Sequence, residues 1–167
     1  MVAMRISSLA PRTRDVGFNN ADKATGKAPK AATDYRKILE DKNVHALFVC
    51  TPDHWHALPT IHACQAGKDV YVEKPASHSV WEGRKMVEAA RKYNRIVQLG
   101  TQTRSGRYTR EAVEYIKSGK LGRIHHVRVL NMKQRPSIGH KPDEPTPPGV
   151  DYSMWLGPAP AWDRSSR

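Results

Sequence analysis

Three short polar segments carry the side chains with the most evident chemistry. Residues 51–54 (TPDH) hold a hydroxyl, a carboxylate and an imidazole, residues 73–75 (EKP) an acid beside a cation, and residues 100–102 (GTQ) an amide. Hydroxyl and amide groups can hydrogen-bond a ribose or a carboxamide, and an ammonium can favour negative charge that develops on a substrate oxygen. Brought together, the three segments would suit a polar, partly anionic ligand.

The adjacent Glu73 and Lys74 allow two interpretations. In the first, Glu73 orients the Lys74 ammonium toward a substrate. In the second, the two side chains only form an exposed ion pair at the end of a strand, which is the commoner fate of a neighbouring acid and base. The residue types do not decide between these interpretations, so both stay open at this point.

The segments between these loops predict alternating strands and helices. Apolar runs of strand length occur at residues 45–50, 69–72 and 95–99. Amphipathic patterns predict helices at about residues 33–40, with Thr33 as N-cap, and at 55–66, 79–93 and 105–118. Short connections between such elements are typical of parallel βαβ units. The sequence therefore predicts the α/β class, with a partial Rossmann-type parallel sheet.

Parallel strands would gather the polar loops in one place. Because all strands of a parallel sheet point the same way, the loops that follow them emerge at one edge, where open α/β sheets bind ligands. We therefore expect Lys74 to lie near His54 and Gln102.

The two ends of the chain read differently from its middle. Residues 1–30 hold no convincing periodic pattern and are expected to be irregular or extended. Residues 123–132 mix polar and apolar side chains like a strand with one open face, which predicts that a different sheet begins there. Residues 141–160 are rich in proline and glycine and are expected to form a loop.

The charge of the chain raises a second function class. Lys and Arg number 28 against 16 Asp and Glu, for a formal net charge of +12, and such an excess can attract polyanions. The cations are scattered, without an RNA-binding signature or zinc-finger spacing, so we expect no nucleic-acid partner. A non-catalytic basic module that recruits polyanions or a partner chain is the alternative function.

Other features exclude or weaken further classes. No run of about 18 apolar residues occurs, which excludes a membrane-spanning helix. Cys50 and Cys64 lack a CxxC partner, and we expect them to be buried, reduced thiols in a cytoplasmic protein. His54, His56 and His62 do not share one helical face, so no metal site is expected.

Two stretches carry a family resemblance. TPDHWHALPTIHACQAGKDVYVEKP (51–75) and RKMVEAARKYNRIVQLGTQTRS (84–105) resemble the glucose-fructose oxidoreductase, inositol dehydrogenase and rhizopine-catabolism (Gfo/Idh/MocA) family, with its TPxxxH and EKP elements in order. The likeness runs from about Ala31 to the end. It implies an NAD(P)-binding Rossmann domain at 31–121, after the segment 1–30, and the beginning of a substrate domain with an antiparallel sheet at 122–167.

The resemblance also implies an activity and a set of site residues. The activity would be hydride transfer between NAD or NADP and a sugar, cyclitol or related polyol, in a homo-oligomeric full-length parent. The implied cofactor-binding residues are Thr51, Pro52, His54, Glu73, Lys74, Gln102 and Trp155. Lys74 also resembles the lysine of the family's catalytic site, and Trp155 belongs to a WLGP segment that would return toward the cofactor.

Two elements of the family pattern are missing. The sequence has no G-x-G-x-x-G turn to approach the pyrophosphate and no acid about 20 residues after it for the ribose. It also reaches Arg167 before the family's second-domain Asp and His. We therefore expect a chain truncated at both ends, inactive by itself, whose choice between NAD and NADP the sequence does not reveal.

Overall fold

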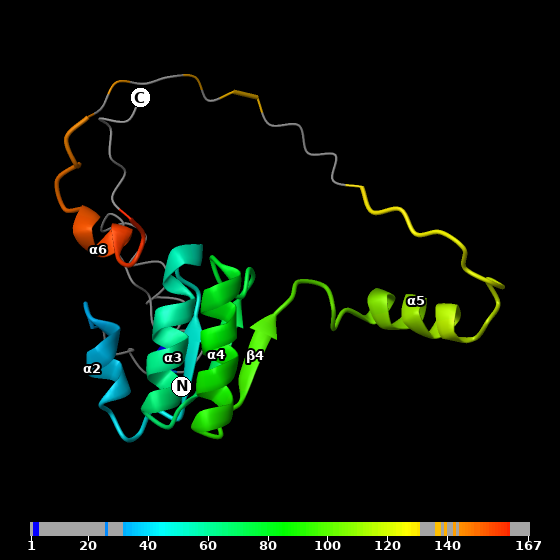
Figure 1. Cartoon of the computed structure of the whole chain (residues 1–167), viewed down its shortest axis with the longest axis horizontal. Helices are drawn as coiled ribbons and strands as arrows, with labels where there is room; N and C mark the ends of the chain where they lie inside the picture. Colours follow the sequence, from blue (N-terminus) through cyan, green and yellow to red (C-terminus); the bar gives the residue numbers. More distant parts are fainter. Residues whose placement is uncertain are drawn as a thin grey trace. The chain divides into compact units, whose positions relative to one another are not determined.

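The structure is a computed structural model that describes residues 2–3, 26, 32–130, 136–137, 139, 142 and 144–160. The chain divides into two compact units, one formed by Met1–Gly100 with Thr146–Arg167 and the other by Thr101–Pro145. The first unit contains the sheet and most of the helices (Figure 1).

The sheet of the first unit has four parallel strands in the order β1-β2-β3-β4. Their bounds are β1 Val2–Ala3, β2 Ala46–Val49, β3 Asp69–Glu73 and β4 Val97–Gly100. The last three match the predicted strands to within two residues, which confirms the α/β class and the parallel sheet. The first lies in the segment expected to be irregular or extended, most of which falls outside the described residues.

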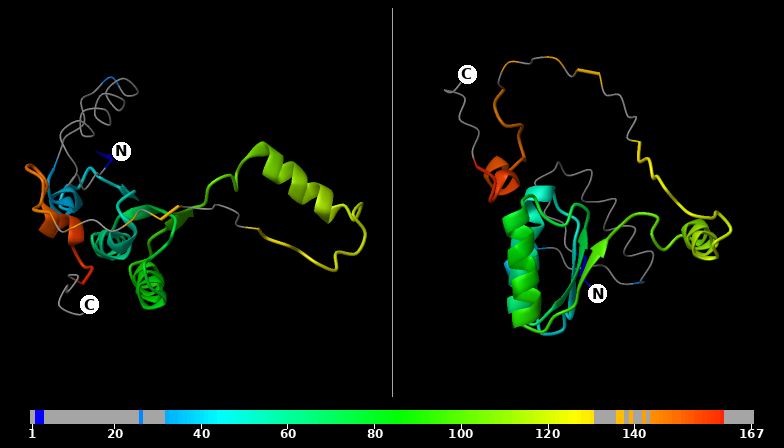
Figure 2. Two further views of the ribbon diagram at one scale, coloured as in Figure 1. Left: turned by 90° about the horizontal axis from the view of Figure 1, so that it is seen from above. Right: turned by 45° about the vertical axis from the view of Figure 1, so that its right-hand side comes forward.

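Helices α3 and α4 lie against the same face of this sheet (Figure 2, right). The helical elements of the unit are α2 Tyr35–Leu39, the 3-10 turn η1 Asp53–Trp55, α3 Ala57–Gln65, α4 Val80–Lys92 and α6 Tyr152–Leu156. The predicted capping box opens α4, since the Ser79 hydroxyl accepts from the Glu82 amide at 3.3 Å and the Glu82 carboxylate accepts from the Ser79 amide at 3.0 Å.

Two helix predictions need correction. The N-cap of α2 is Asp34 rather than Thr33, because the Asp34 carboxylate accepts the backbone N–H of Arg36 at 2.9 Å. The loop predicted at 141–160 contains α6, whose first turn is capped by Asp151 accepting the Met154 amide at 2.9 Å. A five-residue helix is too short to produce a periodic signal among prolines and glycines.

The core lies between the sheet and its helices. Every second residue of β2 and β3 is buried there, including Leu47, Val49 and Val72. Each fully buried aliphatic side chain contributes roughly 1.5–3 kcal/mol. Cys64 is buried as predicted, but Cys50 is exposed. That second prediction was wrong because Cys50 follows the last strand residue, where burial by helices ends.

Tyr35, the buried first residue of α2, forms a polar pair with the half-buried His62. The Tyr35 hydroxyl lies 2.6 Å from His62 Nδ1, and the two rings stack at 5.8 Å between centroids. Burial lowers the pKa of His62, which keeps the ring neutral and able to accept the hydroxyl proton. Burial also raises the pKa of Tyr35 to about 12.

This shift predicts a loss of stability at alkaline pH. An unfolded tyrosine ionises near pH 10, so the folded chain retains the proton of Tyr35 longer, and its stabilising contribution is complete below about pH 10. It is lost between about pH 10 and 12, on the order of 2 kcal/mol. At pH 8 the free energy of unfolding of the wild-type chain, measured in urea, should therefore exceed that of Tyr35→Phe by about 1 kcal/mol. As the pH approaches 12, the wild-type value should fall below that of the variant. A difference that is constant with pH would contradict this assignment.

The second unit consists of α5 Arg107–Lys117 and a chain segment that follows it. The amphipathic pattern of residues 105–118 also predicts that this helix buries Tyr108, Ala112, Tyr115 and Ile116. This prediction is wrong, because no residue of α5 is buried. Residues 123–130, expected to begin a strand, form none. Both errors have one cause: an amphipathic helix face and a strand each need a covering partner, and the described part of this unit supplies neither.

Candidate functional site

Three polar loops leave the sheet at its carboxyl edge. In the register of the strands Val49 pairs with Val72, and Val72 pairs with Leu99, so β2, β3 and β4 end side by side. The loops beginning at Thr51 and Lys74 therefore emerge next to each other, as the parallel order predicted. Gln102 comes two residues after β4 and opens the second unit, and its part in the site stays a prediction.

Thr51 brings an unpaired hydroxyl to this edge. The residue is half-buried, and its Oγ1 is shielded from solvent without a hydrogen-bond partner among the described residues. A buried hydroxyl left unpaired costs on the order of 1–3 kcal/mol, and such groups are rare in folded proteins. A ligand at this edge could supply the missing partner once the atoms that shield the hydroxyl move aside.

Glu73 and Lys74 follow at the end of β3, half-buried and exposed respectively. None of the ion pairs among the described residues involves either side chain. The interpretation of the two as an exposed ion pair is therefore not supported. Burial raises the pKa of the Cys50 thiol, and the nearby Glu73 carboxylate raises it further. The side chain of Glu73 therefore lies near the end of β2.

His56 is the site residue that sequence reasoning missed. Its side chain is only 1% exposed, with Nε2 at 2.9 Å from the carbonyl oxygen of Thr51 and Nδ1 hydrogen-bonded to the carbonyl oxygen of Pro75. The ring thus joins the loop after β2 to the loop after β3. The one feature of the sequence that could have indicated a role for His56 is its place as the last residue of the TPxxxH element.

The turn η1 also holds the carboxyl end of α6. The Trp55 indole donates to the carbonyl oxygens of Met154 and Trp155 at 3.0 and 3.2 Å, and His54 Nε2 lies 2.7 Å from the Trp155 oxygen. Gly157 lies so close to Trp55 that a Cβ there would come within 2.1 Å of the indole ring. The WLGP segment therefore lies beside His54, and the roles of His54, Pro52 and Trp155 toward a cofactor stay predictions.

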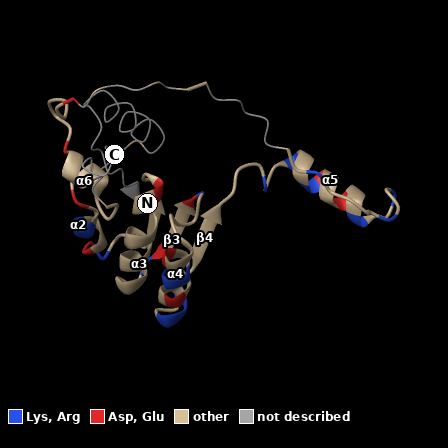
Figure 3. Cartoon of the chain, turned by 45° about the horizontal axis from the view of Figure 1, so that its top comes forward, with Lys and Arg blue, Asp and Glu red and all other residues tan. Residues whose placement is uncertain are grey.

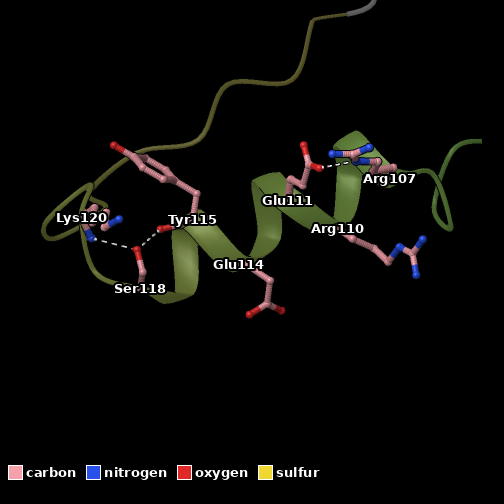
Figure 4. A pocket seen from close by; sticks show the side chains of 7 residues that line it. All are labelled: Arg107, Arg110, Glu111, Glu114, Tyr115, Ser118 and Lys120. Atoms are coloured by element: carbon pink, nitrogen blue, oxygen red, sulfur yellow. Dashed lines mark hydrogen bonds and ion pairs between the residues drawn. The ribbon is translucent and has the colours of Figure 1, made fainter.

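The charged surface does not concentrate at one place on the helices. Figure 3 shows Lys and Arg interleaved with Asp and Glu along α4 and α5. Arg84 pairs with Glu88 at 3.3 Å and Arg107 with Glu111 at 2.6 Å, so part of the basic charge is neutralised locally. A shallow, open depression along α5 is lined by side chains of that helix and the turn after it (Figure 4).

Two absences apply to the described residues. Nowhere among them do three His, Cys, Asp or Glu side chains gather closely enough to hold a metal ion. None of their helices has the length and apolar character that crossing a membrane requires.

A parallel sheet covered by helices, with polar loops at its carboxyl edge, defines a Rossmann-type nucleotide-binding domain. The family model described as "Oxidoreductase family, NAD-binding Rossmann fold" (Gfo/Idh/MocA) matches residues 6–101. The chain belongs to this oxidoreductase family, whose domain binds NAD. The match begins well before Ala31, where the resemblance first becomes evident in the sequence.

Curated relatives and solved structures agree with this assignment. Myo-inositol 2-dehydrogenase of Thermotoga maritima is 29% identical over 123 residues, which cover 74% of this chain and 34% of that protein. Levoglucosan dehydrogenase of Pseudarthrobacter phenanthrenivorans is 30% identical over 115 residues, covering 69% and 27%. A levoglucosan dehydrogenase in complex with NADH and levoglucosan has a TM-score of 0.56 at 29% identity, covering 65% of this chain and 29% of that one. The chain thus spans about a third of its relatives' length.

Proposed function

We propose that the protein to which this chain belongs transfers hydride between NAD(P) and a carbon of a sugar, cyclitol or related polyol. We further propose that the loops at the carboxyl edge of its sheet hold the nicotinamide end of the cofactor. The observation that carries the proposal is the buried Thr51 hydroxyl at this edge, which has no hydrogen-bond partner among the described residues. The substrate class follows from the inositol and levoglucosan dehydrogenases to which the chain is similar.

Each residue at the edge has a distinct part in this proposal. The bound cofactor supplies the hydride acceptor or donor at its nicotinamide ring. Thr51 hydrogen-bonds the cofactor and thereby orients it. Lys74 is exposed and has no ion pair among the described residues. Its ammonium lies at the substrate oxygen and stabilises the negative charge that develops there as the hydroxyl gives its proton to solvent water and the carbon gives hydride to the cofactor. Glu73, next along the backbone, contacts the ribose side and helps to orient Lys74.

Replacing Thr51 by valine tests the cofactor site, because it should weaken the binding of NADH without lowering the stability of the free chain. Valine has nearly the shape of threonine and lacks the unpaired hydroxyl, so the free chain should be as stable as before or slightly more stable. Binding of NADH, followed by nicotinamide fluorescence, should weaken roughly 5- to 10-fold, the value of one hydrogen bond.

Thr33→Val provides the matched control, since Thr33 is exposed and outside the edge. It should change neither quantity. No saturable response of the wild-type chain to millimolar NADH would argue against the proposal. Tight, steeply salt-dependent binding to RNA or DNA in its place would favour the basic binding module.

A further inference from the structure

We propose that His56 is a positioning residue that ties the Glu73-Lys74-Pro75 loop to the loop after β2 and so fixes the Lys74 ammonium at the sheet edge. The inference rests on the proposed function of Lys74 and adds to the site a residue that the sequence pattern alone does not assign. What points to it is a buried ring on the segment after β2 whose Nδ1 is hydrogen-bonded to the carbonyl oxygen of Pro75 in the loop after β3.

The ring is held firmly by the element that carries it. His56 precedes the first residue of α3, its backbone N–H donates to the Asp53 carbonyl at 3.1 Å, and its own carbonyl accepts from the buried Thr60 hydroxyl at 2.8 Å. Because the backbone of His56 is tied on both sides, the ring has little freedom to follow a moving loop. It can therefore act as a fixed point for the residues to which it is bonded.

The loop after β3 depends on this fixed point. The ladder between β3 and β4 ends where Glu73 pairs with Gly100. Beyond it, the bond from His56 to the Pro75 carbonyl is the one side-chain hydrogen bond to residues 74–76 in the described part of the chain. Lys74 has no ion pair of its own there, so the place of its ammonium is set by the backbone of this loop. A displacement of about 1 Å in such a group can lower a reaction rate on the order of 100-fold.

The burial of His56 separates positioning from direct catalysis. With the side chain 1% exposed and a carbonyl oxygen facing each nitrogen, the ring presents no accessible nitrogen to a substrate or a metal ion. It acts through Lys74 rather than on the reacting atoms.

Two substitutions separate the contact of His56 with Pro75 from its contact with Thr51. In His56→Asn the side-chain amide nitrogen lies near the place of Nδ1 and can still donate to the Pro75 carbonyl. In His56→Gln the amide nitrogen lies near the place of Nε2 and can donate only to the Thr51 carbonyl. Both variants keep one amide donor at the same buried position, so a merely structural role predicts similar effects for the two.

The experiment is amide hydrogen exchange of the full chain, resolved for residues 74–79 and for α4. With the loop released, His56→Gln should exchange about 10-fold faster at residues 74–79, whereas His56→Asn should stay within about threefold of wild type and α4 should not change in either variant. Equal acceleration in both variants, or none in His56→Gln, would overturn the inference.

A measurement on the unsubstituted chain covers the case in which a variant does not fold. The ring N–H facing Pro75 should exchange slowly with water and show coupling across the hydrogen bond to the Pro75 carbonyl carbon in NMR spectra. A ring proton in fast exchange with solvent would overturn the inference as well. Neither assay contains cofactor, so a failed NADH titration would reject the proposed function alone.

Discussion

Lys74→Ala is expected to lower kcat by at least about 100-fold while the affinity for NADH stays within about threefold. Truncation of an exposed side chain that pairs with no acid in the described part of the chain should leave the fold intact, so the loss would come from the chemical step. The missing ammonium no longer stabilises charge on the substrate oxygen in the transition state. Steady-state kinetics of the protein to which this chain belongs, on a panel of inositols and anhydrosugars, would measure it.

Two variants make this test specific to the position and to the charge. Lys42→Ala removes another exposed lysine, from the turn before β2, and should leave turnover unchanged. Lys74→Arg keeps the charge but alters the geometry of the donors, and we expect an intermediate loss of turnover. If Lys74→Ala turned over as fast as Lys42→Ala, Lys74 would have no part in the mechanism.

Trp55→Ala is expected to lower the free energy of unfolding by about 3–5 kcal/mol, the usual range for truncating a buried aromatic side chain. The indole is 7% exposed, contacts the Tyr35 ring edge-on at 6.2 Å between centroids, and donates to the two carbonyls of α6. The change therefore opens a cavity in the core and removes the hydrogen bonds that hold α6. Urea denaturation followed by circular dichroism would measure the loss.

The chain offers a matched control and a partial variant for this prediction. Trp81 is 68% exposed, so Trp81→Ala should change stability by no more than about 0.5 kcal/mol. Trp55→Phe keeps most of the packing but not the N–H, and should lose only about 1–2 kcal/mol. Equal losses in Trp55→Ala and Trp81→Ala would show that Trp55 is not a core residue.

The strands, the capping box of α4 and the parallel order were predictable because each depends on local pattern. The apolar run ending at Val49 and the S-x-x-E sequence at Ser79 specify their elements without reference to distant residues. Parallel order then placed the loops after β2 and β3 at one edge of the sheet. The sequence thus located Thr51 and Lys74, the two residues that carry the proposed function.

Features that depend on distant partners were not predictable in this way. His56 gains its place from the Pro75 carbonyl, a backbone atom that no sequence pattern reveals. Tyr115 is exposed because its burial required a surface that covers α5. The N-cap of α2 is the carboxylate of Asp34 rather than the neighbouring Thr33. In each case the residue type was compatible with the prediction, and a contact outside the local pattern decided the outcome.

The hydrogen bonds from Trp55 to Met154 and Trp155 join residues 99 and 100 positions apart. On a ribosome adding about 5–20 residues per second, this indole is made roughly 5–20 seconds before its acceptors. During that interval the nascent chain presents an unsatisfied aromatic side chain next to a sheet that can already have begun to form. The close contact between Gly157 and this ring can therefore form only near the end of synthesis.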